Sequence, residues 1–210
     1  MKISEIFVSI QGEGRYQGTP VVFVRTSGCT RACSFCDSKY HVQGKEYTTD
    51  KLIKELEKFG VNTVVWTGGE PTQQIKEIKE VIFKTNMYHH LETNGDLIVV
   101  ERAGYFVDGL NLANIFDYMC ISPKDYKAAK KTGEFVKYYP KEYVDIKVVT
   151  DLKTLGMDSI KYATMLMPLT VYNNAIDKET RQKVWDYCVK HNLSYSGRLH
   201  IEVWGQKKGI

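Results

Sequence analysis

The sequence lacks a long apolar run. Its longest uninterrupted aliphatic stretches, such as residues 97–100, fall far short of the roughly 20 residues that a membrane-spanning helix needs. Residues 1–10 alternate apolar and polar side chains, which is typical of a strand. They contain neither the continuous apolar segment nor the small-residue cleavage site of a secretory signal. These features predict a cytoplasmic protein without a membrane partner.

A surplus of one charge sign and an internal linker are missing as well. The formal charge is +4 at pH 7, but the lysines are dispersed and no arginine-rich stripe or basic run with interleaved aromatics appears. This pattern argues against nucleic acid as a partner. No stretch rich in Pro, Gly or Ser divides the 210 residues, and that length suffices for one well-buried core. We therefore expect a single domain over residues 1–210.

The apolar spacing alternates between strand and helix patterns along the chain. Helices are expected between the cap candidates at 48–50 and Gly60, around 75–82, and over 178–191. Strands are expected at residues 1–10, 21–25, 63–66, 89–93, 118–121, 143–150 and 164–168, with a last strand in LHIEVW, residues 199–204. Such alternation predicts an α/β protein with a largely parallel sheet, whose site is built from the loops that follow the strands.

Cysteines are few, but three of the five are clustered. Cys29, Cys33 and Cys36 have the spacing C-x3-C-x2-C, so one loop must wrap all three around a compact centre, and Gly28 gives that loop backbone freedom at its entry. In a reducing compartment, clustered cysteines serve metal binding or catalysis more often than disulfides, and an odd count fits a disulfide framework poorly. The loop is therefore a metal-binding candidate.

Two kinds of centre fit three clustered thiols. A structural zinc site needs a fourth close ligand, for which His41 is a candidate. The isolated Cys120 and Cys188 are interpreted instead as small buried apolar residues. A four-iron cluster held by only three thiolates leaves one iron without a protein ligand, open to a substrate or cofactor.

The three cysteines, with the aromatic Phe35 before the last of them, resemble the signature of the radical S-adenosylmethionine (SAM) superfamily. The resemblance implies a [4Fe–4S] cluster on Cys29, Cys33 and Cys36, whose open iron binds SAM, and reductive cleavage of SAM to a 5′-deoxyadenosyl radical. TGGEP (67–71), ETNG (92–95) and SPK (122–124) resemble further superfamily elements. The residues implied to contact SAM are Phe35, Gly69, Glu70, Thr93, Asn94, Ser122 and Lys124. Two glycines allow close backbone approach to a ligand, and Glu70 is expected to accept a hydrogen bond from the SAM amino group.

The order of EIFVSIQGEG, CDSKY, TGGEP, ETNG, SPK, LMP and RLHIEVWG resembles the 7-carboxy-7-deazaguanine synthase family along nearly the whole chain. The resemblance implies conversion of 6-carboxy-5,6,7,8-tetrahydropterin to 7-carboxy-7-deazaguanine with loss of ammonia, on the route to queuosine and related 7-deazapurines. It further implies a shortened, partial TIM-type (β/α)6-like barrel and a homodimer. An external electron donor such as flavodoxin or ferredoxin is implied, and no catalytic side chain beyond the cluster and SAM.

The substrate chemistry suits several residues outside the cysteine loop. Gln11 and Glu13 offer acceptors to the amidine-like donor edge of a pterin, and Arg25 can form a bidentate pair with its carboxylate. The resemblance adds Thr67 and His200 to this set. It also implies Mg²⁺ near the substrate carboxylate, with the residue two positions after the last cysteine as a ligand. That residue is Ser38, where threonine is usual, and a serine oxygen can still bind this hard cation.

Two other functions remain as alternatives. A glycyl-radical activase is also a small radical SAM enzyme, but it acts on a protein and predicts no pterin-binding element such as Gln11, Glu13 and Arg25. A zinc-binding interaction module predicts a colourless metal centre and no SAM binding. The pterin-binding N-terminal element therefore distinguishes the synthase from the activase, and the colour of the bound metal distinguishes both enzymes from the zinc-binding module.

Overall fold

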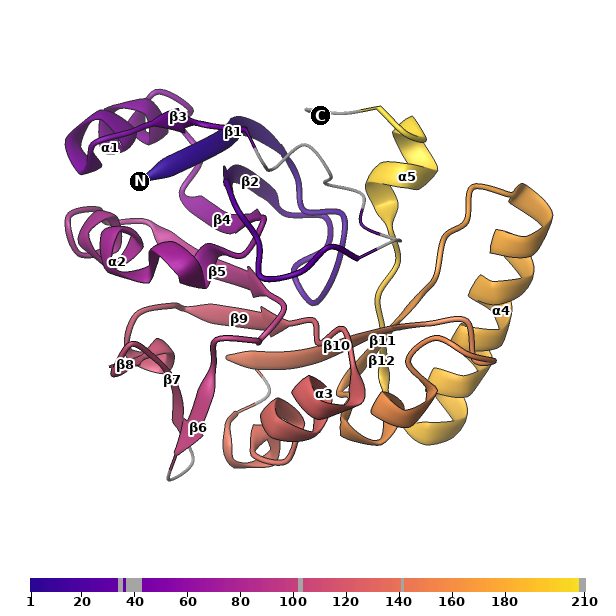
Figure 1. The fold of residues 1–210 in the computed structure, drawn as a ribbon. Helices are drawn as coiled ribbons and strands as arrows, with labels where there is room; N and C mark the ends of the chain where they lie inside the picture. The colour runs from indigo at the N-terminus through magenta and orange to yellow at the C-terminus, as the bar shows by residue number, and fades with distance from the viewer. Residues whose placement is uncertain (34–35, 37–42, 102–103, 141, 208–210) are drawn as a thin grey trace.

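A computed structural model describes residues 1–33, 36, 43–101, 104–140 and 142–207 (Figure 1). Most of its strands belong to one large sheet. In chain order they are β1 (Lys2–Ile10), β2 (Pro20–Thr26), β3 (Lys45–Glu46), β4 (Thr63–Gly68), β5 (Tyr88–Thr93), β9 (Tyr118–Ile121), β10 (Val144–Thr150), β11 (Met165–Pro168) and β12 (Ser194–Tyr195).

The large sheet is parallel over most of its width. In the described part of the chain its order is β12-β11-β10-β9-β5-β4-β2-β1-β3. Neighbours from β2 to β12 pair in parallel, whereas β1 is antiparallel to β2 and β3. Spatial order thus follows chain order from β2 onward, as in a TIM-type barrel, but β3 and β12 stay at opposite edges in the residues described. The predicted partial barrel is confirmed.

Helices flank the sheet (Figure 1). They are α1 (Thr49–Glu57), α2 (Ile75–Phe83), α3 (Tyr126–Gly133), α4 (Asn174–His191) and α5 (Leu199–Trp204), with 3-10 turns at Pro71–Gln74, Leu112–Asn114, Val136–Tyr138 and Met157–Tyr162. The amphipathic spacing explains the first two: α1 buries Leu52 and Leu56, and α2 buries Ile75, Ile78, Val81 and Ile82. These side chains pack with Val22, Val64 and Trp66 of the sheet in one core.

The predicted strand in LHIEVW is wrong, because Leu199–Trp204 is the helix α5. Apolar residues at alternate positions are typical of a strand, but a strand needs a neighbour to pair with. Here the backbone N–H of Leu199 donates to the carbonyl of Gly12, and the carbonyl of Arg198 accepts from Ile201 and Glu202. The segment therefore satisfies its backbone in a helical turn against the N-terminal loop.

The sequence reading also missed or shortened some elements. Helix α4 begins at Asn174, four residues before the expected start, because the Asn173 side chain caps it by accepting from the N–H groups of residues 175 and 176. Helix α3 was not expected, since the face that it buries consists of small residues, including Ala128 and Ala129. A small antiparallel sheet of β6 (Val99–Glu101), β7 (Gly104–Val107) and β8 (Leu110–Asn111) was not expected either.

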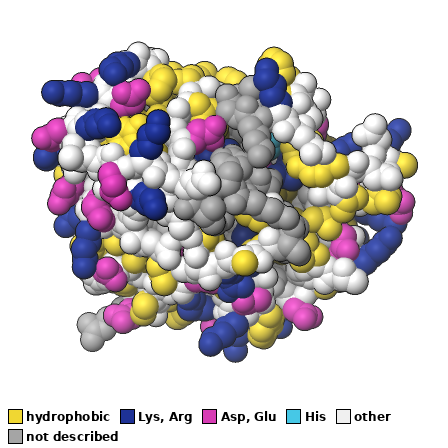
Figure 2. All heavy atoms as spheres, turned by 45° about the horizontal axis from the view of Figure 1, so that its top comes forward, with side chains coloured by type: hydrophobic (Ala, Val, Ile, Leu, Met, Phe, Trp, Pro, Cys, Tyr) yellow, Lys and Arg dark blue, Asp and Glu magenta, His cyan; other side chains and the backbone are white. Residues whose placement is uncertain are grey.

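The surface carries charges of both signs. Figure 2 shows lysines and arginines interspersed with aspartates and glutamates on the face it presents. None of the helices in the described ranges is both long enough and apolar enough to cross a membrane.

Candidate active site

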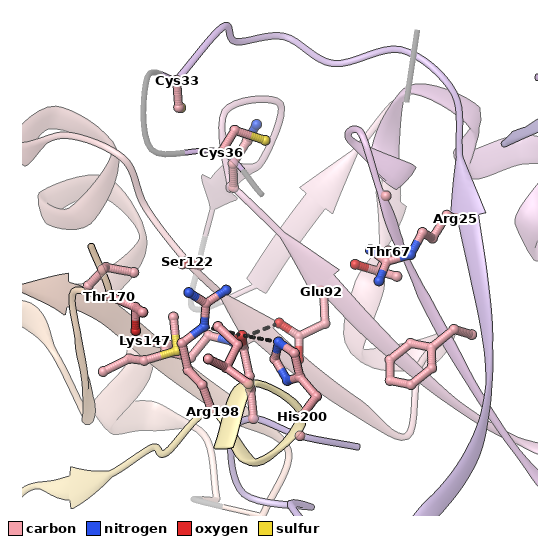
Figure 3. Close-up of a pocket in the computed structure, with 18 of the residues that line it drawn as sticks. Arg25, Cys33, Cys36, Thr67, Glu92, Ser122, Lys147, Thr170, Arg198 and His200 are labelled. Atoms are coloured by element: carbon pink, nitrogen blue, oxygen red, sulfur yellow. Dashed lines mark hydrogen bonds and ion pairs between the residues drawn. The ribbon is translucent and has the colours of Figure 1, made fainter. Parts of the chain in front are cut away.

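A cavity of about 360 Å³ lies at the carboxyl ends of the parallel strands (Figure 3). Its walls include Thr67 on β4, Thr93 at the end of β5, Ser122 just after β9, and Met167 on β11. Parallel strands end at the same edge of a sheet, so residues far apart in sequence meet there. The predicted site residues that line the cavity are Gln11, Glu13, Arg25, Cys29, Cys33, Cys36, Thr67, Gly69, Thr93, Asn94, Ser122, Lys124 and His200.

Two predicted site residues, Phe35 and Ser38, lie outside the described residues, as does His41, the candidate fourth zinc ligand. The proposed magnesium ligand and the aromatic of the cysteine loop therefore have no described position.

Cys29, Cys33 and Cys36 all line the cavity (Figure 3 labels Cys33 and Cys36). Two donors approach Cys29: the backbone N–H of Arg31 lies 3.4 Å from its Sγ, and Nδ2 of Asn94 lies 3.8 Å away. Hydrogen bonds to the cysteine sulfurs are among the contacts that tune a bound iron–sulfur cluster. Within the described residues no three His, Cys, Asp or Glu side chains converge on a single metal-ion position. In a four-iron cluster each thiolate binds a different iron atom, so three cysteines that line one cavity without sharing a single ion position suit such a cluster.

The TGGEP turn packs directly against the entry of the cysteine loop. The N–H of Gly69 donates to the carbonyl of Thr26 at 3.0 Å, and the N–H of Glu70 donates to that of Gly28 at 2.8 Å. A Cβ atom on Gly69 would lie only 1.6 Å from the Gly28 oxygen, and Gly68 has a φ of +106°. The glycines are thus required by the contact between two loops, in addition to any approach to a ligand.

Glu70 is fully buried and does not line the cavity. Its Oε1 accepts from the N–H and hydroxyl of Thr72 at 3.1 and 2.6 Å and from the Thr93 hydroxyl at 2.6 Å, while Oε2 accepts from the Asn94 N–H at 2.8 Å. Burial raises its pKa, and these hydrogen bonds oppose the rise. The carboxylate thereby joins TGGEP to the ETNG turn, whose Thr93 and Asn94 face the cavity.

Arg25 lies on another wall of the cavity, near Thr67 (Figure 3). Its Nε lies 3.2 Å from Oε2 of Glu5, and its guanidinium stacks 5.3 Å above the centroid of the Phe7 ring. These contacts with β1 orient the guanidinium beside the cavity.

A cluster of charged side chains forms the end of the cavity away from the cysteines (Figure 3). Lys147 Nζ lies 2.8 Å from Glu13 Oε2 and 3.2 Å from Glu92 Oε2. Arg198 Nε lies 3.1 Å from Glu13 Oε1, and His200 Nε2 lies 4.0 Å from the same oxygen. The segment that carries Arg198 and His200 thereby meets the N-terminal loop.

The two carboxylates of this cluster differ in their electrostatics. Burial by itself favours the neutral acid of Glu13, but Lys147, Arg198 and His200 outweigh it and hold the pKa of Glu13 well below its usual range. Burial raises the pKa of Glu92, with Lys147 opposing that rise. The pKa of Glu13 is therefore lowered and that of Glu92 raised, and Lys147 is the cation that opposes protonation of Glu92.

Sequence reasoning missed three members of this cluster: Glu92, Lys147 and Arg198. Glu92 opens the ETNG motif, and Arg198 stands two positions before the predicted His200. Lys147 sits among apolar residues in a buried strand, where an unpaired ammonium is costly. In the sequence, a lysine within such an apolar strand is the feature that indicates a carboxylate partner near its ammonium group.

Comparisons with known proteins show which family the chain is similar to. Residues 23–171 match the family model described as the radical SAM superfamily. A 7-carboxy-7-deazaguanine synthase of Pyrobaculum aerophilum is 30% identical over 224 residues, covering 100% of this chain and 97% of that protein. One from Hyperthermus butylicus is 30% identical over 97% of this chain and 92% of that protein. One from Bacteroides thetaiotaomicron is 46% identical, over 45% of this chain and about half, 52%, of that protein.

Solved structures show the same fold. QueE from Escherichia coli superposes with a TM-score of 0.59 at 18% identity, covering 95% of this chain and 94% of that one. SuiB from Streptococcus suis gives 0.58 at 14% identity, over 84% of this chain and 48% of that one.

Proposed function

Because the chain belongs to the radical SAM superfamily and, within it, to the 7-carboxy-7-deazaguanine synthases, we propose that it contracts 6-carboxy-5,6,7,8-tetrahydropterin to 7-carboxy-7-deazaguanine with loss of ammonia. One observation supports placing this reaction in the cavity. The cavity has three cysteines at one end and a cluster of carboxylates and cations at the other. The cavity thus has room and chemistry for a radical source and a polar heterocycle side by side.

The cysteine end is proposed to hold the cofactors. Cys29, Cys33 and Cys36 would hold a [4Fe–4S] cluster, which together with SAM would supply the radical chemistry of the reaction. The residues proposed to contact SAM are the Gly69 backbone, Thr93, Asn94, Ser122 and Lys124, all of which line the cavity, together with Phe35. Glu70 is proposed to act through Thr93 and Asn94 by fixing their turn. The chain's own contribution is to place the substrate carbon and to exclude water.

The charged end is proposed to bind the pterin. Glu13 and Glu92 offer carboxylate acceptors, and Gln11 is joined to Glu92 through an Nε2···Oε1 contact of 3.5 Å. An amidine-like edge carries several N–H donors, so adjacent acceptors recognise it. Arg25 is proposed to pair with the substrate carboxylate, with Thr67 and His200 completing the walls.

Mg²⁺ is proposed as a further cofactor, with Ser38 as a ligand near the substrate carboxylate. Mg²⁺ takes few protein ligands and keeps several waters, so a single hydroxyl in addition to substrate oxygens would suffice. Omission of Mg²⁺ from the turnover assay described below tests this point.

We also propose an external electron donor such as flavodoxin or ferredoxin, a cytoplasmic location, and a homodimer. Trp185 and Val189, one turn apart on α4, are 56% and 72% exposed, and an apolar pair of this kind supports a self-association surface. Sedimentation velocity tests the dimer.

The function is tested by anaerobic incubation of the reconstituted protein with SAM, a strong reductant, Mg²⁺ and the carboxypterin, followed by mass spectrometry. The expected product is lighter than the substrate by one ammonia. If 5′-deoxyadenosine forms while the pterin returns unchanged, the proposed function is wrong and the protein is a radical SAM enzyme with another substrate, such as a glycyl-radical activase. If SAM is not cleaved and zinc is the bound metal, the protein is instead a zinc-binding interaction module.

Replacing Arg25 with lysine is expected to raise the KM for the carboxypterin about 10-fold or more, because a point charge cannot reproduce the planar fork that pairs with a carboxylate. Cluster content and SAM cleavage without substrate should stay at native levels. Steady-state kinetics beside an iron assay measure both. Unchanged kinetics with the carboxypterin would remove Arg25 from the site.

A further inference from the structure

Lys147 is the most deeply buried cation of the cavity cluster. It lies on β10, and its side chain is 3% exposed. Its Nζ donates to Glu13 Oε2 and to Glu92 Oε2, which belong to the N-terminal loop and to β5. One ammonium therefore joins two carboxylates that come from segments far apart in the sequence.

The groups around Lys147 explain why that junction is needed. Facing it are Glu13 from the N-terminal loop, Glu92 from β5, and Cys120 from the neighbouring strand β9. Arg198 and His200 approach Glu13 from the C-terminal segment. Arg198 and His200 contact Glu13, whereas Lys147 contacts both Glu13 and Glu92. In the described part of the cluster, Lys147 is therefore the cation that links the two carboxylates.

Two carboxylates that share one buried site repel each other, and without a cation one of them takes up a proton. A protonated carboxyl loses its acceptor charge and presents a donor, which is the wrong polarity for an N–H edge. Since Glu13 keeps the cation Arg198, removal of Lys147 would place the proton on Glu92.

We propose that Lys147 is a positioning residue for the substrate, which holds Glu13 and Glu92 side by side as two ionised acceptors for the donor edge of the pterin. This inference rests on the proposed function and deepens it. Lys147 itself does not need to touch the substrate, because its hydrogen bonds go to the two carboxylates.

The same strand anchors the loop a second time. Two residues before Lys147, Asp145 is fully buried and accepts from Arg15 Nε at 2.8 Å and Nη2 at 3.0 Å. Residues two apart on a strand point to the same face, so β10 presents an anion to Arg15 and a cation to Glu13. The Asp145–Arg15 pair holds the N-terminal loop against β10. Lys147 is therefore not needed to attach this loop, and its charge acts on Glu13 and Glu92.

The test is Lys147→Met, which keeps much of the side-chain volume and removes the charge. We expect its KM for the carboxypterin to exceed the native value about 10- to 100-fold at pH 7.5. 5′-Deoxyadenosine formation without substrate should stay within about twofold, because the cysteine end is untouched. The ratio of the variant KM to the native KM should fall as pH rises from about 7.5 to 9.5, as Glu92 loses its added proton. Substrate titration cancels in this ratio.

Lys183→Met serves as the matched control, since Lys183 pairs with Glu179 on the exposed face of α4. It should leave KM unchanged at every pH. A purely structural role for Lys147 would lower activity by the same factor across the pH range, and that outcome overturns the proposal.

A second variant covers the case in which Lys147→Met does not fold. Glu92→Gln preserves the shape and the Lys147–Glu13 pair, and it should raise KM about 10-fold with SAM cleavage intact. A native KM in this variant also overturns the inference. The native protein is assayed first: failure to convert the carboxypterin refutes the proposed function, whereas conversion with a pH-independent ratio refutes the role of Lys147 alone.

Discussion

Replacing Cys33 with alanine is expected to abolish assembly of the iron–sulfur cluster and all cleavage of SAM. A four-iron cluster with three protein ligands has no thiolate to spare, since the fourth iron must stay open for SAM. The remaining cysteines outside the loop offer no substitute. Cys120 and Cys188 are 0% and 2% exposed, on β9 and α4, and neither lines the cavity. Burial raises the pKa of the Cys120 thiol well above its usual value, which keeps it protonated.

The measurements are iron and sulfide content after anaerobic reconstitution, visible absorbance, and 5′-deoxyadenosine formation by chromatography. Cys188→Ala is the control, because it also removes one thiol but leaves the loop intact. That variant should assemble a cluster and cleave SAM like the native protein. Full SAM cleavage by Cys33→Ala would refute the assignment of the loop as the cluster site.

Replacing Glu70 with glutamine is expected to lower both the free energy of unfolding and the rate of SAM cleavage. The carboxylate accepts four hydrogen bonds in a fully buried position. A glutamine amide keeps one acceptor oxygen, and its NH₂ group must face either the Asn94 N–H or the Thr72 N–H. Because a buried donor opposite a donor forfeits its hydrogen bond, we expect a loss of about 2–4 kcal/mol in the free energy of unfolding.

The functional loss follows from the residues that Glu70 holds. Thr93 and Asn94 face the cavity, and Asn94 also approaches Cys29, so a shifted ETNG turn should slow SAM cleavage about 10-fold or more. Denaturant unfolding and 5′-deoxyadenosine rates measure the two effects. Glu80→Gln, at an exposed carboxylate on α2 that contacts Thr49, should change neither. A Glu70→Gln variant with native stability would show that the buried carboxylate network is dispensable.

Residues with strong local patterns were predicted well. The cysteine spacing indicated one loop around one centre, and all three cysteines line one cavity. Periodicity placed α1, α2 and the parallel strands, because each element buries one face and its spacing records that face. The rule that parallel strands end at one edge then brought Thr67, Thr93 and Ser122 to the same cavity.

Local patterns failed where backbone pairing or side-chain direction decides the outcome. LHIEVW has the alternation of a strand, but its backbone pairs with Gly12 and with itself, and it forms α5. The carboxylate of Glu70 accepts hydrogen bonds from Thr93 and Asn94, more than twenty residues away, and no local pattern indicated these partners. Neither outcome is visible within a short window of sequence.

By itself, the sequence determined the kind of chemistry, through the three cysteines, and the alternation of strands and helices that places a site at the strand ends. Only the tertiary structure decided how charge is arranged within that site. Lys147 meets Glu13 across 134 positions of the chain and Glu92 across 55. The stability of this triad, a buried lysine between two partly buried carboxylates, depends on distances and burial that the sheet order sets. These cannot be read from the separate segments.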